Sequence, residues 1–125
     1  MTIQEAVLKQ VQFLRECQEI RKKDAIRHAD ALNDYEGREA IASLEINEGT
    51  AHDSHGEAIS LTNDIARKGY VKTRTIELKK LLNTAKAELE SSAAKVEVER
   101  SVLSAIKDLR GDAELDISHL GKYDI

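Results

Sequence analysis

The sequence predicts an all-α protein, either an elongated antiparallel helical hairpin or a three-helix bundle, with coiled-coil-like packing and dimerisation expected. The chain has no proline and 34% charged residues, a composition typical of long helices. Apolar residues recur at alternating steps of four and three along most of its length, which places them on one helical face. The strongest turn signal surrounds Gly49 and separates two arms of comparable length, and a short connection makes sequential helices neighbours.

The first arm is predicted to be one helix that begins near residue 3. Thr2 and Glu5 have the spacing of a capping box, in which two side chains bind backbone N–H groups at a helix start. A glycine inside a helix costs only about 1 kcal/mol relative to alanine, so we expect the helix to continue through Gly37 to about Asn47. The residues expected on its apolar face are Ile3, Val7, Leu14 and Cys17, widened by Val11, Phe13 and Ile20, and farther along Ala25, Ala29, Leu32, Ala40, Ile41 and Leu44.

The segment 48–53 is predicted to be the turn between the arms. Gly49 is suited to the left-handed conformation that ends a helix. Ser54 and Glu57 repeat the capping-box spacing, which predicts that a second helix begins at Glu57. β-branched residues cluster after Gly69, so a break there is favoured over one helix that continues to residue 110.

The segment 71–110 is the longest stretch without a predicted break, because it lacks glycine and proline and is rich in strong helix formers. Gly111 is predicted to end it. The sequence is therefore divided into a helical domain, 1–110, and a C-terminal tail, 111–125, that is either docked or flexible. The residues expected on the inner face of the long helix are Leu78, Leu82, Ala85, Leu89, Ser92, Val96, Glu99, Leu103 and Ile106.

Two of these inner positions, Ser92 and Glu99, are polar. A polar residue in a helix interface fixes register or partner number at a cost in stability. If this part of the helix is rotated instead, the inner row is Ala93, Val98, Val102 and Leu109. Because both rows are apolar, this half of the helix is expected to contact a second neighbour. The predicted interface for self-association or a partner consists of Val96, Val98, Val102, Leu103, Ile106 and Leu109.

The sequence predicts no enzyme, no cofactor and no metal site. His52 and His55 have an H-x-x-H spacing that two metal ligands can use, but two histidines in a polar turn are more often solvated. The single cysteine, Cys17, lies on the apolar face, where a small buried side chain is expected. Carboxylates two positions apart, such as Glu97 and Glu99, point in different directions and do not converge on one substrate atom.

The net charge of −4 is unevenly distributed. Residues 72–110 carry nine basic and six acidic groups. The flanking segments are acidic: residues 1–48 carry seven basic and ten acidic groups, residues 49–71 two and three, and the tail one and four. The basic segment and its acidic flanks are expected to complement each other within the fold or between subunits. No apolar run approaches the ~20 residues that span a membrane. The N-terminus lacks the layout of a secretion signal and the lone cysteine suits a reducing compartment, so a cytoplasmic location is expected.

The expected function is a non-enzymatic protein–protein interaction module, such as an adaptor, assembly factor or small regulator, that acts through its long amphipathic helix and forms a homodimer. One alternative is nucleic-acid binding through the basic segment 72–80, where Lys72, Arg74, Lys79 and Lys80 are the phosphate-contacting residues. Glu77 lies among them and no aromatic residue is placed to stack on bases, which makes this alternative less expected. The other is a small acidic inhibitor of a basic partner, such as a viral inhibitor.

Overall fold

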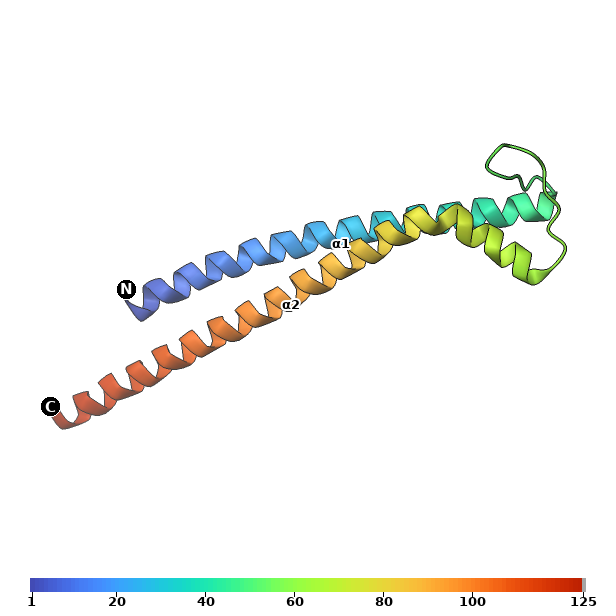
Figure 1. The fold of residues 1–125 in the computed structure, drawn as a ribbon. Coiled ribbons are helices and arrows are strands. Elements are labelled where there is room, and N and C mark those ends of the chain that lie inside the picture. Colours follow the sequence, from blue (N-terminus) through green and yellow to red (C-terminus); the bar gives the residue numbers. More distant parts are fainter. Residues whose placement is uncertain (125) are drawn as a thin grey trace. The chain divides into compact units, whose positions relative to one another are not determined.

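The computed structural model describes the backbone of residues 1–124 and the side chains of residues 1–109. It contains two helices, α1 (Ile3–Glu48) and α2 (Asp64–Asp124), joined by the loop 49–63 (Figure 1). The loop contains one isolated antiparallel bridge, between His52 and Ala58. The two helices pack against each other as a hairpin, which confirms the all-α hairpin prediction.

Helix α1 begins and ends as predicted. The N–H of Glu5 donates to Thr2 Oγ1 at 3.1 Å, and the helix continues through Gly37 without interruption. At its end Gly49 has a φ of 72°, its N–H donates to the Ile46 carbonyl at 3.3 Å, and the N–H of Thr50 donates to the Glu45 carbonyl at 2.8 Å. This pair of bonds forms a Schellman motif, which satisfies carbonyls that the end of a helix leaves unpaired.

The prediction that a helix begins at Glu57 is wrong. Asp53 Oδ1 accepts the backbone N–H groups of His55 at 2.8 Å and Glu57 at 3.0 Å, so a different side chain takes the role predicted for Ser54. These bonds hold a turn rather than a helix start, because an aspartate side chain competes for nearby backbone donors. Helix α2 begins later, where Asn63 Oδ1 accepts the N–H of Ala66 at 2.8 Å.

The predicted break at Gly69 is also wrong, since α2 continues through it. The turns around the glycine are fixed by packing: Tyr70 is 8% exposed and Thr75 is 3% exposed. The Thr75 hydroxyl donates back to the Val71 carbonyl at 2.8 Å, which a β-branched residue can do inside a helix. This tertiary burial outweighs the low helix propensity of the segment.

At the other end, α2 continues through Gly111 to Asp124, so the prediction that Gly111 ends the helix is wrong. Whether the side chains of the tail 111–125 dock or remain flexible lies outside the residues with described side chains.

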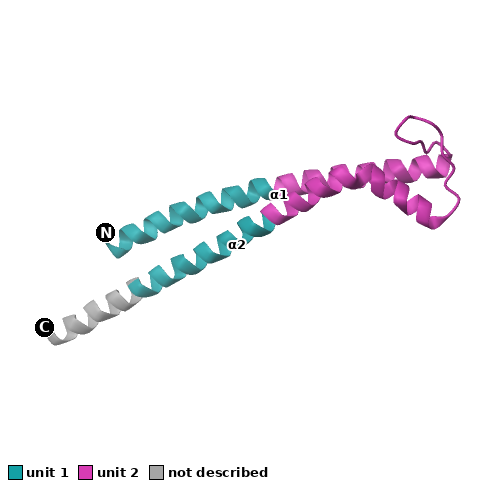
Figure 2. Ribbon diagram, viewed as in Figure 1, with its two compact units in different colours: residues 1–24, 89–125 teal, residues 25–88 magenta. Residues whose placement is uncertain are grey.

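The chain consists of two units (Figure 2). Unit 1 comprises residues 1–24 and 89–125, and unit 2 comprises residues 25–88. The core of unit 1 is formed by Leu14, Cys17 and Val96, with Leu103 packed against it. The core of unit 2 is formed by Ala42, Ala51 and Tyr70, with Ile46, Ile59, Leu61 and Val71 packed against it.

The inner face predicted for the long helix is confirmed within α2. Its buried members are Leu82, Ala85, Val96 and Glu99, and the half-buried ones are Leu78, Leu89, Ser92, Leu103 and Ile106. The rotated alternative is wrong, because Val98 is 56% exposed and Leu109 is 60% exposed. The spacing of four and three residues therefore located the inner face correctly even where its members are polar.

The inner face predicted for α1 is correct only in its first half. Val7, Leu14 and Cys17 are buried. Farther along, Leu32 is half-buried as predicted, and the other buried or half-buried residues are Asp24, His28, Ala31, Tyr35, Ala42, Glu45 and Ile46. The residues predicted to face inward that are exposed instead are Phe13, Ile20, Ala25, Ala29, Ala40, Ile41 and Leu44. The regular spacing continues here, but several inner positions are polar, so hydrophobicity no longer marks the inner face.

Replacing Gly69 with alanine is expected to raise the free energy of unfolding by about 0.5–1 kcal/mol, because α2 is continuous there and alanine loses less backbone entropy than glycine. The added Cβ would meet no atom within 4 Å. The same substitution at Gly49 is expected to lower it by about 1–2 kcal/mol, because its φ of 72° is left-handed. Urea unfolding followed by circular dichroism measures both, and a destabilised Gly69→Ala variant would contradict the continuous helix.

Replacing Asn63 with alanine is expected to lower the free energy of unfolding by about 1 kcal/mol, because its side chain caps α2. Ser54→Ala is the matched control and is expected to change it by less than about 0.5 kcal/mol, since Ser54 is an exposed loop residue. Thermal or urea unfolding of the two variants compares them directly. A larger loss of stability for Ser54→Ala would indicate that a helix begins at Glu57, as the capping-box spacing predicts.

Candidate interaction surfaces

Unit 1 contains a polar contact between its two helices. Glu99 is 7% exposed, and its Oε2 accepts a hydrogen bond from Gln10 Nε2 at 2.7 Å. The same amide nitrogen is 3.0 Å from the Glu99 carbonyl oxygen. On α2 itself, Lys95 Nζ lies 2.9 Å from Glu99 Oε1. Sequence analysis singled out Glu99 but missed Gln10, although Gln10 lies between Val7 and Leu14 at the regular spacing of the inner face.

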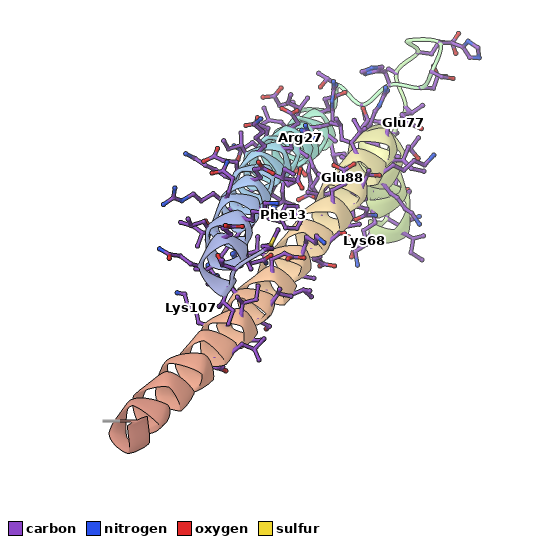
Figure 3. All side chains as sticks on the ribbon, turned by 90° about the vertical axis from the view of Figure 1, so that its left-hand side faces the viewer. Phe13, Arg27, Lys68, Glu77, Glu88 and Lys107 are labelled. Carbon is purple, nitrogen blue, oxygen red and sulfur yellow. The ribbon has the colours of Figure 1, made fainter. Side chains whose placement is uncertain are left out.

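These contacts stabilise the charged forms of both ionisable groups. The hydrogen bond from Gln10, and then that from Lys95, lowers the pKa of Glu99 below its ordinary value of 4.5. The hydrogen bond with Glu99 and its negative charge raise the pKa of Lys95 above 10.5. Lys95 Nζ also lies 5.3 Å from the centre of the Phe13 ring, in cation–π geometry (Phe13 is labelled in Figure 3). Lys95 therefore contacts α1 on one side of unit 1.

On that side of unit 1, α2 exposes an uncharged row, which we call the outer row. Its members follow one another at steps of three or four residues, and all are exposed: Ser91, Ala94, Val98, Val102, Ala105 and Leu109. Val98 is 56%, Val102 is 38% and Leu109 is 60% exposed. Val102 lies seven residues, or two turns, beyond Lys95, so Phe13, itself 40% exposed, borders the same side.

The six residues of the predicted interface therefore divide between two faces of α2. Val96 is fully buried against Leu14 and Cys17, and Leu103 packs against the same core. Ile106 is half-buried on the inner face. The contacts of Val96 and Leu103 are thus made within the chain. The other three, Val98, Val102 and Leu109, belong to the outer row.

Unit 2 contains an open groove between α1 and α2, with a volume of about 560 Å³. Ile46 of α1 and Val71 and Ile76 of α2 supply its apolar lining. Its basic lining residues all come from α2 and are Arg67, Lys68, Lys72 and Lys79, whereas Glu39 of α1 is the only acidic one (Lys68 is labelled in Figure 3).

Tyr35 of α1 forms part of this groove. Lys79 Nζ of α2 lies 5.0 Å from the centre of the Tyr35 ring, and Glu39 and Thr75 line the same groove. A hydrogen bond with Glu39, together with burial and the carboxylate charge, raises the pKa of Tyr35 above its ordinary value of 10.0.

A second polar cluster joins the loop of unit 2 to its helices. Glu45 Oε2 accepts the hydroxyl of Tyr70 at 2.6 Å and lies 3.1 Å from His52 Nδ1. Arg74 donates to the His52 carbonyl, and its guanidinium lies 5.1 Å from the centre of the Tyr70 ring. The His52 side chain therefore contacts Glu45 of α1. His55 is held separately, through the bond from its backbone N–H to Asp53. This cluster anchors the loop.

The basic segment 72–80 does not form one free cationic face. Arg74 is engaged by the loop, Lys79 lies over Tyr35, and Lys80 Nζ is 3.5 Å from Glu77 Oε1. Lys72 alone of the four predicted phosphate ligands has no such contact among the residues with described side chains. It lies instead at the groove.

Acidification is expected to destabilise the protein through Glu99. Its pKa is lower folded than unfolded, so its contribution to stability is present above 4.5 and is lost as the pH falls through the folded pKa. In Glu99→Gln, the loss of stability between neutral pH and a pH below 4.5 is expected to be smaller than in the unmodified chain. Glu97→Gln is the control, because Glu97 is exposed and its carboxylate pairs with Arg100 of the same helix at 2.8 Å. The urea midpoint of each chain is measured at both pH values. An equal fall of the midpoint in all three chains would contradict a stabilising role of the Glu99 carboxylate.

Other classes of site find no support in the described part of the chain. Among the side chains described there, no three His, Cys, Asp or Glu residues lie together in a way that could hold a metal ion. Neither helix contains, within its described residues, a stretch long and apolar enough to cross a bilayer. Comparison with protein-family models, with curated proteins and with solved structures finds no match.

Proposed function

We propose that this protein is a non-enzymatic protein–protein interaction module, of the adaptor or assembly-factor kind, that forms a homodimer through the outer row of unit 1. The observation that supports this most is the exposure of Val98, Val102 and Leu109 in one uninterrupted uncharged row. In a chain with 34% charged residues, such a row is costly to leave in water and is typical of a surface that another helix covers.

The residue sizes in the outer row suit close contact between helices. Ser91, Ala94 and Ala105 have small side chains, which let a second helix approach, and the valines and the leucine supply apolar area. The inner residues of α2 follow the alternating spacing of a coiled coil, and the outer row has steps of three and four residues as well. A second copy can therefore pack its own α2 along the outer row. The dimer proposed here is a helical assembly in which each α2 contacts α1 on one side and the partner on another.

Nucleic-acid binding through the segment 72–80 has less support. Three of its four basic residues, Arg74, Lys79 and Lys80, already contact the chain's own side chains or backbone. Phosphate binding would have to displace these contacts. A basic surface that binds phosphates is expected to hold several free cationic groups in a row.

Replacing Val98 and Val102 together with glutamate is expected to weaken self-association at least tenfold, or by about 1.4 kcal/mol or more, because two charges would be buried in the interface. Sedimentation equilibrium of the full chain measures this. The matched control is Ile65→Glu with Leu81→Glu, since Ile65 is 86% exposed and Leu81 is 60% exposed and both lie in unit 2.

The control is expected to associate like the unmodified chain, and circular dichroism shows whether both variants retain their helices. A chain that is monomeric at high concentration, or a control that weakens association as much as the row variant, would overturn the proposal.

A further inference from the structure

The groove of unit 2 is separate from the outer row and has its own chemistry. Four basic residues and one acidic residue line it, so the lining has a net charge of +3. Arg67 Nη1 lies 4.0 Å from Asp64, and Lys79 lies over Tyr35. Lys68 and Lys72 are exposed and have no ion pair among the residues with described side chains. The groove therefore presents two available ammonium groups next to an apolar lining.

This combination selects for a particular kind of ligand. The apolar lining, which includes Ile46, Val71 and Ile76, favours aliphatic or aromatic side chains. The ammonium groups favour carboxylates beside those side chains. Lining residues extend from Tyr35 to Asn47 on α1 and from Arg67 to Lys79 on α2, a length of roughly 18 Å at 1.5 Å per residue of helix. An acidic, partly apolar segment of about three helical turns fits these requirements.

The C-terminal segment of the chain has this character. Residues 111–125 carry four acidic groups and one basic group, for a net charge of −3, which equals the excess charge of the groove with opposite sign. The same fifteen residues include Leu115, Ile117, Leu120, Tyr123 and Ile125. As a helix they would be about 22 Å long, close to the length of the groove.

We propose that the groove of unit 2 binds the acidic C-terminal segment 111–125 of a second copy of this chain, with the carboxylates of that segment at Lys68 and Lys72 and its apolar side chains against Ile46, Val71 and Ile76. The contact links copies through a surface other than the outer row. It does not depend on the outer row, because the two surfaces share no residue.

A zero-length carbodiimide cross-linker joins lysine amines to carboxylates in direct contact and tests this on the full chain. Copies labelled with ¹⁴N and ¹⁵N are mixed in equal amounts, and cross-linked peptides are identified by mass spectrometry. Cross-links from Lys68 or Lys72 to Asp112, Glu114 or Asp116 are expected, with mixed-isotope pairs as frequent as same-isotope pairs. Same-isotope pairs alone would assign the groove to the chain's own tail and overturn the proposal. The absence of tail cross-links at these lysines, or equal cross-linking at the exposed Lys9 and Lys22, would also overturn it.

A binding measurement with variants gives an independent readout. A fluorescein-labelled peptide of sequence 111–125 is titrated with the full chain, and fluorescence anisotropy is recorded. Lys68→Glu with Lys72→Glu is expected to weaken binding at least tenfold, whereas Lys9→Glu with Lys22→Glu, which makes the same charge change on other exposed lysines, is expected to leave it within about twofold.

A peptide with Asp112→Lys and Asp116→Lys is expected to show the reverse preference and to bind the Lys68→Glu, Lys72→Glu chain more tightly than the unmodified one. Equal affinity of all chains for the peptide would overturn the proposal. So would equal affinity of a scrambled peptide of the same composition, since the groove would then accept acidic segments in general.

Discussion

The buried contact between Gln10 and Glu99 is the constraint on which the packing of unit 1 depends. A carboxylate that is 7% exposed must be hydrogen-bonded, and its partner on α1 is the Gln10 amide. Sliding α1 along α2 by one turn would replace that amide with an aliphatic residue, such as Leu14, and leave Glu99 Oε2 without a donor from α1. The regular apolar spacing permits several registers, whereas this polar pair is satisfied in one. The position of the outer row relative to Phe13 follows from that register.

Sequence periodicity predicted the two arms, the turn at Gly49 and the inner face of α2, because all three are properties of local spacing. The failures occurred where another contact, local in one case and tertiary in the other, opposed the predicted signal. Ser54 and Glu57 have the spacing of a cap, but the Asp53 carboxylate takes the backbone donors first. Gly69 is a plausible break, but the burial of Tyr70 and Thr75 holds the helix together around it. Propensity gives a weak preference in each case, and the outcome is decided by a neighbouring side chain at Asp53 and by tertiary packing at Tyr70.

The two candidate surfaces were predictable from the sequence to different degrees, because one lies along a single helix and the other combines two. The exposed valines and Leu109 form a row along one helix, so their spacing is visible in the sequence. The groove of unit 2 combines residues of both helices, and its character depends on Tyr35 and Glu39 lying opposite Thr75 and Lys79. No spacing within one helix reveals such a pairing. The second half of α1 was misread because Asp24 and His28 occupy inner positions there, and a search for apolar residues selects their exposed neighbours instead.

The burial of Cys17 makes the local opening of unit 1 measurable through the reactivity of its thiol. This thiol is the only one in the chain, it is 5% exposed, and it packs with Leu14 and Val96 between the two helices. An alkylating reagent reaches it only when that part of the hairpin opens. When closing is faster than alkylation, the alkylation rate is proportional to the population of the open form. The ratio of this rate to that of a small free thiol then gives the local opening free energy of unit 1. The chain thus carries, without any added label, a kinetic probe of the unit on which the outer row lies.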